Sequence, residues 1–226
     1  MTPPAACVVF DLDDTLYLEA DYARSGFAAV GEWAAANLGV TDFAAQAWHA
    51  HESGARGDVF DRALAASGIE AHPDLILRLV DVYRRHHPRI DLLPDAAECL
   101  RTLQGKVFLG LISDGPALSQ RAKVEALQLR TIMDEVIITD DLGRTYWKPH
   151  PRAFEAMQQR ANLPARSCYY IGDNPDKDFI AARMLGWNTV RVRRQGGLHC
   201  DKANATETCA GREVADLCSI PSLVLP

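Results

Sequence analysis

Acidic side chains follow three short apolar segments of the sequence, each at the point where the segment ends. The segments and the polar motifs after them are residues 7–10 followed by DLDDT, residues 107–112 followed by SDG, and residues 168–171 followed by GDNPDKD. Carboxylates that meet at one place repel one another and raise each other's pKa unless a cation lies among them. Because the donors are oxygens without a cysteine or histidine cluster, a hard divalent ion such as magnesium fits better than zinc or copper.

A lysine, Lys148, lies in the segment WKPHP, just before a helix that the pattern predicts to begin at Pro151. From there its ammonium group can reach the same acids. It would neutralise phosphate oxygens or hold a carboxylate ionised. A bound cation and a few local donors of this kind indicate chemistry on a small anion.

These groups have to be positioned by a sheet. Apolar, β-branched or aromatic runs predict five buried strands, with helical patterns between most of them; they are residues 7–10, 107–112, 136–139, 168–171 and 189–192. The alternation predicts a doubly wound α/β fold, in which helices cover both faces of a parallel sheet. Ligands collect at the carboxyl ends of the strands in such sheets, and the acids follow those ends.

The stretch between the first two strands is far longer than an ordinary βα connection, and most of it has the pattern of helices. The predicted helix starts in this stretch are Glu19, Thr41, Asp58 and Pro73. Further helical patterns follow Pro94 and Pro151. We therefore expect two domains, a catalytic core of residues 1–17 and 93–226 and a small all-helical domain of residues 18–92.

The composition of the 226 residues, 48% hydrophobic and 24% charged, is that of an ordinary globular protein. The formal net charge of -6 provides no positive field for a nucleic-acid polymer or an anionic membrane. The sequence shows no signal-peptide pattern and no apolar run long enough to span a membrane, so we expect a cytoplasmic protein. Cys7, Cys99 and Cys168 fall inside strand or helix patterns and are predicted to be buried thiols.

Together the motifs strongly resemble the haloacid dehalogenase (HAD) superfamily, in its phosphatase branch with a helical cap inserted after the first motif. DLDDT matches the first motif, ISDG the second, Lys148 the third and GDNPDKD the fourth, in the same order and strand context. The resemblance covers nearly the whole chain, because residues 18–92 fall where that branch carries its cap. It implies a Rossmann-like core, Mg²⁺ as the cofactor, and a cap that closes over the metal and selects the leaving group.

The resemblance implies the catalytic and metal-binding roles. Asp11 would attack phosphorus to give an aspartyl-phosphate, and Asp13 would protonate the leaving alkoxide and then deprotonate the attacking water. Asp11, the backbone carbonyl of Asp13, and Asp173 would bind the metal. Dehalogenating members lack an acid at the position of Asp13, so the name of the superfamily does not describe the chemistry expected here.

The second and third motifs are implied to bind the phosphoryl group. The hydroxyl of Ser113 and neighbouring backbone N–H groups would hold its oxygens, with Asp114 and Gly115 completing the turn. Lys148 would balance the charge that grows on the phosphoryl oxygens and keep Asp11 ionised. Simpler interpretations stay open, with Asp11 and Ser113 as helix caps and Lys148 as an exposed lysine.

Other residues have supporting or surface roles. Thr15 is expected to support the first-motif loop, with a contact from its hydroxyl to the second acid of that motif as an alternative. Asp178 would orient Lys148, bind the metal through water, or be a plain acid at a helix start. Arg24 and Glu19 are candidates for substrate specificity, because they follow the first motif where caps of this branch face the active site. The residues expected to be solvated are Asp14 (or a capping acid), Asp176, Lys177, His49, His51, His86 and His87.

The expected activity is Mg²⁺-dependent hydrolysis of a small phosphorylated metabolite, either a sugar phosphate or a nucleoside monophosphate. We expect no nucleic-acid polymer and no membrane as partner, and either a monomer or a homodimer. Phosphoryl transfer to a sugar hydroxyl, as in a phosphomutase, is the main alternative, and a non-catalytic regulatory protein is the second. A phosphonate-cleaving relative would need a cap lysine, and residues 18–92 contain none.

Overall fold

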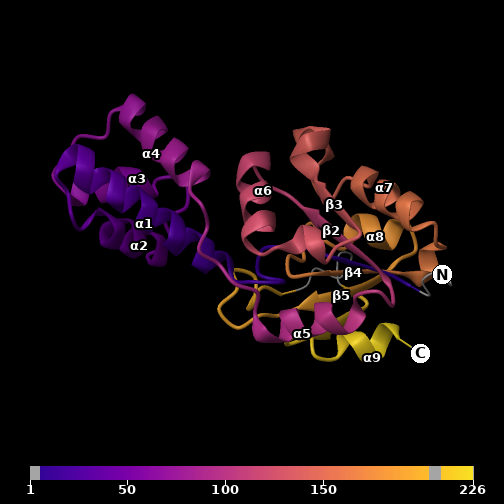
Figure 1. The fold of residues 1–226 in the computed structure, drawn as a ribbon. Helices are drawn as coiled ribbons and strands as arrows, with labels where there is room; N and C mark the ends of the chain where they lie inside the picture. The colour runs from indigo at the N-terminus through magenta and orange to yellow at the C-terminus, as the bar shows by residue number, and fades with distance from the viewer. Residues whose placement is uncertain (1–5, 204–209, 226) are drawn as a thin grey trace. The chain divides into compact units, whose positions relative to one another are not determined.

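The chain divides into two compact units in the computed structural model, which describes residues 6–203 and 210–225. The sheet unit comprises Met1–Glu19 and Asp91–Pro226, and the helical unit comprises Ala20–Ile90. The helical unit is therefore an insertion that follows the first strand of the sheet unit (Figure 1). Among the described residues, no helix combines the length and the apolar composition that crossing a bilayer requires.

The sheet unit contains a six-stranded sheet in the order β3-β2-β1-β4-β5-β6, with every neighbouring pair of strands parallel. The bounds are Cys7–Phe10 (β1), Phe108–Ser113 (β2), Glu135–Ile138 (β3), Cys168–Gly172 (β4), Asn188–Val192 (β5) and Arg212–Val214 (β6). The central strand β1 is buried along its whole length. Its continuous apolar sequence is typical of a parallel strand that is covered on both faces.

The strand order reverses at β1, which lies between β2 and β4. Phe10, at the end of β1, is in register with Leu111 of β2 and Ile171 of β4. The residues that come next along these three strands therefore leave the sheet at one edge. Ligands bind in the crevice outside the carboxyl ends of the strands where the order of an open α/β sheet reverses.

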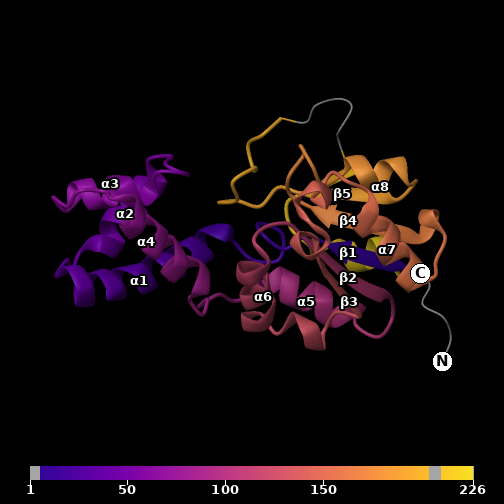
Figure 2. The same cartoon turned by 90° about the horizontal axis from the view of Figure 1, so that it is seen from above.

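Helices cover both faces of this sheet (Figures 1 and 2). The bounds are Pro94–Leu103 (α5), Ala117–Ala126 (α6), Arg152–Ala161 (α7), Ile180–Met184 (α8) and Ile220–Val224 (α9). On one face, Phe154 and Met157 of α7 and Ala181 of α8 join Val9 and Tyr170 in a buried cluster. Figure 1 shows α5 and α9 together on the opposite face. Short 3-10 helices cover Leu129–Thr131, Thr139–Leu142, Arg144–Tyr146 and Ala165–Ser167.

The helical unit is built from α1 to α4 around a core of its own. The bounds are Glu19–Leu38 (α1), Phe43–Glu52 (α2), Val59–Ala66 (α3) and Pro73–Arg85 (α4). Phe27, Val30 and Ala34 recur at helical spacing along α1 and are buried in that core. Gly31 lets α2 come close to α1, because a Cβ at residue 31 would lie 2.7 Å from the Cβ of Ala44.

The doubly wound α/β fold and the all-helical insertion are thus confirmed. All five predicted strands are present close to their predicted bounds, whereas α6, α9 and β6 were not predicted. Cys7, Cys99 and Cys168 are buried free thiols, as predicted. The prediction of a solvated His86 is wrong, because its ring packs 4.9 Å from that of Tyr22.

Candidate active site

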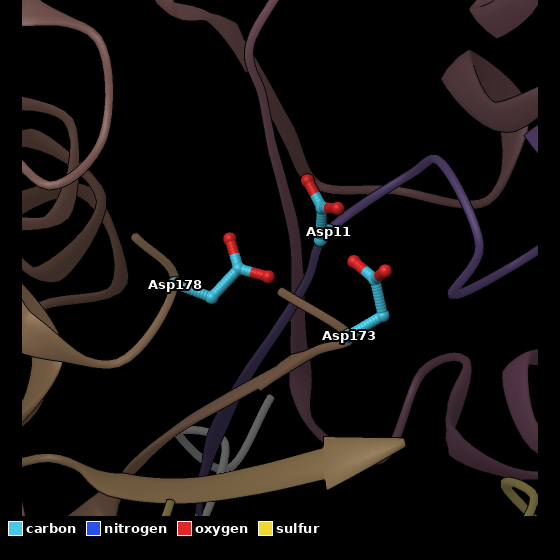
Figure 3. Close-up of side chains that lie close together, drawn as sticks. All are labelled: Asp11, Asp173 and Asp178. Atoms are coloured by element: carbon cyan, nitrogen blue, oxygen red, sulfur yellow. The ribbon is translucent and has the colours of Figure 1, made fainter. Parts of the chain in front are cut away.

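Three carboxylates meet at the edge where the strand order reverses. Asp11 follows β1, Asp173 follows β4, and Asp178 lies in the loop between β4 and α8. All three residues are buried, and one carboxylate oxygen of each lies within 4.8 Å of the others. Figure 3 shows the three side chains converging from separate parts of the backbone.

Burial makes two of these acids, Asp173 and Asp11, hard to ionise. It raises the pKa of Asp173 to about 9, and the carboxylates of Asp178 and Asp11 add to that shift. It raises the pKa of Asp11 to about 7, although the ammonium of Lys148 opposes the change. A cation among the three acids would remove this cost, and all the available donors are oxygens. The group therefore has the chemistry of a site that can hold a hard divalent metal ion.

Lys148 is enclosed by the acids and by Tyr170. Its Nζ donates to Asp11 Oδ1 at 2.5 Å, to Asp178 Oδ1 at 2.8 Å and to the Tyr170 hydroxyl at 2.9 Å. Its side chain is 0% exposed. Asp178 in turn accepts the backbone N–H of Asn174 at Oδ2, at 2.9 Å, so the same acid fixes both the lysine and the loop.

Asp13 is held at both of its carboxylate oxygens. Oδ1 accepts hydrogen bonds from Lys123 Nζ at 2.7 Å and from the Tyr17 hydroxyl, and Oδ2 accepts one from Gln120 Nε2 at 2.9 Å. Burial alone would raise the pKa of Asp13, but Lys123 and these hydrogen bonds hold it below its ordinary value. The three partners were not predicted; two of them lie on α6, which the sequence pattern did not reveal.

Gln120 and Thr139 hold the side chains of the second motif, Ser113 and Asp114, in place. Gln120 Nε2 donates to Ser113 Oγ at 2.9 Å, and Thr139 Oγ1 donates to Asp114 Oδ1 at 2.7 Å. Gly115 has a φ of +129°, and a Cβ there would lie 3.0 Å from Gln120 Nε2. Both facts favour glycine at this turn.

A cavity of about 220 Å³ opens over these groups. The predicted site residues in its lining are Asp11, Asp13, Asp114, Gly115 and Asp173. Glu19, a predicted candidate for substrate specificity, also lines the cavity, and the lining residues that were not predicted for the site are Asp14, Trp147, Asn174, Lys177 and His199. The prediction of a solvated Asp14 is wrong. Lys177, predicted to lie at the surface, has a side chain that is 33% exposed. Asp14 is buried and accepts the backbone N–H of Glu19, the first residue of α1, at 2.9 Å, which is the capping contact of the alternative prediction.

Two further predicted residues, Thr15 and Arg24, make contacts of other kinds. Thr15 is buried, and its hydroxyl finds no hydrogen-bond partner within residues 6–203 and 210–225; its carbonyl accepts Arg194 Nη2 at 2.8 Å. Arg24 lies in the helical unit, where its guanidinium stacks 4.2 Å from the centre of the Trp48 ring. A substrate contact by Arg24 stays a prediction.

Comparison with known proteins gives relatives over most of the chain. A family model described as a haloacid dehalogenase-like hydrolase matches residues 5–186. The glyceraldehyde 3-phosphate phosphatase of Methanopyrus kandleri is 31% identical over 202 residues, covering 83% of each chain. The ribulose-1,5-bisphosphate 5-phosphatase of Halopiger xanaduensis is 29% identical over 204 residues, covering 82% of this chain and 84% of its own.

The fold has a relative among solved structures as well. The HAD hydrolase YfnB of Bacillus subtilis, in a crystal structure bound to magnesium, matches with a TM-score of 0.69 at 20% identity. The match covers 99% of this chain and 100% of that one. The four motifs all lie within the residues that the family model matches. This chain is an enzyme of the haloacid dehalogenase-like hydrolase family.

Proposed function

We propose that the protein is a Mg²⁺-dependent phosphatase that hydrolyses a small sugar phosphate through an aspartyl-phosphate on Asp11. One observation carries the proposal: Asp11 is a buried acid bonded to Lys148 at 2.5 Å, and it lines one cavity with Asp13 and Asp173. A nucleophile, an acid-base group and a cation site are thereby within reach of one small ligand.

The first step is attack of Asp11 on phosphorus. Lys148 occupies Oδ1, which leaves Oδ2 to form the new P–O bond while the bond to the leaving oxygen breaks. The ammonium of Lys148 favours the ionised, nucleophilic form of the acid. Magnesium, when bound by Asp11, the carbonyl of Asp13, and Asp173, supplies positive charge against the phosphoryl oxygens.

Asp13 moves the protons of both steps. It protonates the leaving alkoxide in the first step and takes a proton from the attacking water in the second, which releases phosphate and restores Asp11. Tyr17, Gln120 and Lys123 hold it in place. Because these contacts hold Asp13 ionised, the negative charge of an arriving phosphate has to raise its pKa before it acts as the acid.

The substrate class is supported by the relatives. The archaeal proteins that match over more than four fifths of this chain are named for glyceraldehyde 3-phosphate and ribulose-1,5-bisphosphate, both sugar phosphates. We therefore place a small sugar phosphate such as glyceraldehyde 3-phosphate ahead of a nucleoside monophosphate.

The test is phosphate release from sugar phosphates, nucleotides and p-nitrophenyl phosphate, with Mg²⁺ and with EDTA, for wild type and Asp13→Ala. We expect turnover of a sugar phosphate that EDTA abolishes and that the variant loses. Isomerisation of a sugar phosphate without free phosphate would instead make the protein a mutase. No turnover of any compound would contradict the proposal.

A further inference from the structure

We propose that Lys177, in the loop between β4 and α8, binds the phosphoryl group of the substrate directly, whereas Lys148 serves to hold Asp11 and Asp178. This assignment rests on the proposed function, because it places a phosphate monoester in the cavity beside Asp11. It divides between two lysines the tasks that the sequence assigns to one.

Lys148 has no donor left for a substrate. An ammonium group carries three N–H donors, and those of Lys148 go to Asp11, Asp178 and Tyr170 at 2.5 to 2.9 Å. Its side chain is 0% exposed and it is absent from the described lining of the cavity. A direct bond from Lys148 to a phosphoryl oxygen would cost it one of these partners.

Lys123 is similarly enclosed. Its Nζ donates to Asp13 at 2.7 Å, its side chain is 5% exposed, and within the described chain it does not line the cavity. Neither of the two buried ammonium groups is therefore presented to a ligand. A phosphate monoester carries two negative charges near neutral pH, and its oxygens are best bound by charged donors.

Lys177 does face the cavity. It lines the cavity together with Asp11, Asp114 and Asp173, and its side chain is 33% exposed. In the described part of the chain its Nζ donates to Asp114 Oδ2 alone, at 3.1 Å. Two of its three donors are therefore available to an oxyanion in the cavity.

The backbone beside Lys177 and its ammonium group are both held in place. Next to it along the chain, Asp178 is fully buried and hydrogen-bonded to Lys148 and to the backbone N–H of Asn174. Asp114, which accepts the hydrogen bond of the ammonium group, is itself fixed, because its Oδ1 accepts hydrogen bonds from Thr139 and from the backbone N–H of Lys148. Such prior fixing lowers the entropy lost when the ammonium meets a ligand.

A simpler role is that Lys177 only balances the charge of Asp114. The two roles are separated by direct binding of inorganic phosphate, measured by titration calorimetry in the presence of Mg²⁺. Lys177→Met is expected to weaken phosphate binding roughly tenfold or more, the usual effect of losing a charged hydrogen bond. Lys177→Arg, which keeps the charge and the donors, is expected to bind phosphate much more tightly than Lys177→Met.

Two further variants make the result specific. Lys106→Met removes the same charge from an exposed site outside the cavity lining, and is expected to bind phosphate like wild type. The double variant Asp114→Asn with Lys177→Met removes both charges of the ion pair while keeping the Oδ1 acceptor. If Lys177 binds phosphate, the double variant stays weak; recovery of wild-type affinity would overturn the inference and leave charge balance as its role.

The inference can fail separately from the proposed function. Wild type that hydrolyses a sugar phosphate while Lys177→Met keeps wild-type phosphate affinity would overturn the role of Lys177 only. Wild type that binds no phosphate in the presence of Mg²⁺ would overturn both. Melting temperatures of all variants exclude loss of fold as the cause of weak binding.

Discussion

Burial raises the pKa of Asp173 to about 9, and the neighbouring carboxylates of Asp178 and Asp11 add to the shift. An acid whose pKa is higher in the folded chain than in the unfolded chain makes folding less favourable once the pH exceeds the unfolded value. At neutral pH the raised pKa of Asp173 therefore lowers the free energy of unfolding of the metal-free protein. A bound divalent cation reverses that loss, so metal binding and stability are linked at this residue.

Asp173→Asn is accordingly expected to melt a few degrees higher than wild type in EDTA, since about 1 kcal/mol corresponds to roughly 2–4 °C for a chain of this size. The same change removes a proposed metal ligand, so Mg²⁺ should no longer raise the melting temperature. Thermal scans with EDTA and with Mg²⁺ measure both effects. Asp176→Asn, an exposed acid of the same loop, is the control; an unchanged response of Asp173→Asn to Mg²⁺ would contradict the assignment.

The Tyr17 hydroxyl is a contact to Asp13 that can be removed without changing a charge. Tyr17→Phe is expected to lower kcat for a sugar phosphate about tenfold, because one hydrogen bond that orients the acid is lost. KM should change little. The loss should be smaller for p-nitrophenyl phosphate, whose leaving group needs no protonation.

Steady-state kinetics with both substrates test this role of Tyr17. Equal losses for the two substrates would mean that Tyr17 does not act through protonation of the leaving group by Asp13. A change in KM alone would point to a role in binding.

Among the elements, the loop between β4 and α8 is closely constrained where it leaves Gly172, the last residue of β4. Asp178 Oδ2 lies 2.5 Å from where a Cβ on Gly172 would be, so the loop can carry only glycine there without moving this acid. The same oxygen accepts the N–H of Asn174, and the other oxygen of Asp178 accepts Lys148. A shift of Asp178 would therefore displace Lys148 and, through the bond from Lys148 to Asp11, the nucleophile as well.

Gly172→Ala is expected to destabilise the protein by about 1–3 kcal/mol, the usual cost of overpacking, and to lower activity more than tenfold. Gly57→Ala is the control, because a Cβ there meets nothing within 4 Å. Urea unfolding and steady-state kinetics measure the two effects. Wild-type stability and activity in Gly172→Ala would show that the loop does not need the observed position of Asp178.

The elements that the sequence predicted are those with a strong periodic signal. The strands that lead to Asp11, Asp114 and Asp173 are short apolar runs bounded by polar motifs. That pattern predicts both the type of element and the edge of the sheet at which the acids lie. The sequence therefore predicted the fold class and the residues that lie together at the strand ends.

The missed residues depend on packing between elements. Gln120 and Lys123 on α6 are polar, so the pattern offers no reason to bury them. Their burial accompanies hydrogen bonds to Asp13, in the loop after β1, and to Ser113, at the end of β2. Lys177 resembles a surface lysine for the same reason, since its place in the cavity depends on Asp114. Such contacts link residues far apart in the sequence, and single-sequence periodicity carries no signal for them.

For the molecule as a whole, the binding of a negatively charged phosphate substrate has to depend on local positive charges. The net charge is -6, so the overall field repels an anionic substrate. The local positive charges are the lysines at the strand ends and the proposed magnesium ion. These groups gather there because β1, β2 and β4 are parallel neighbours, whose carboxyl ends lie at one edge. The reversal of strand order at β1 accounts for the crevice at that edge.

The central claim is that Asp11 is phosphorylated during turnover. The direct measurement is rapid quenching of the Asp13→Asn variant after mixing with Mg²⁺ and labelled p-nitrophenyl phosphate, whose leaving group needs no protonation, followed by mass spectrometry of the peptides. We predict acid-stable, base-labile phosphate on the peptide that contains Asp11, because the variant lacks the base that activates water for the second step. Asp11→Asn should carry none. Phosphate release by wild type with no modification at Asp11 in either sample would contradict the account.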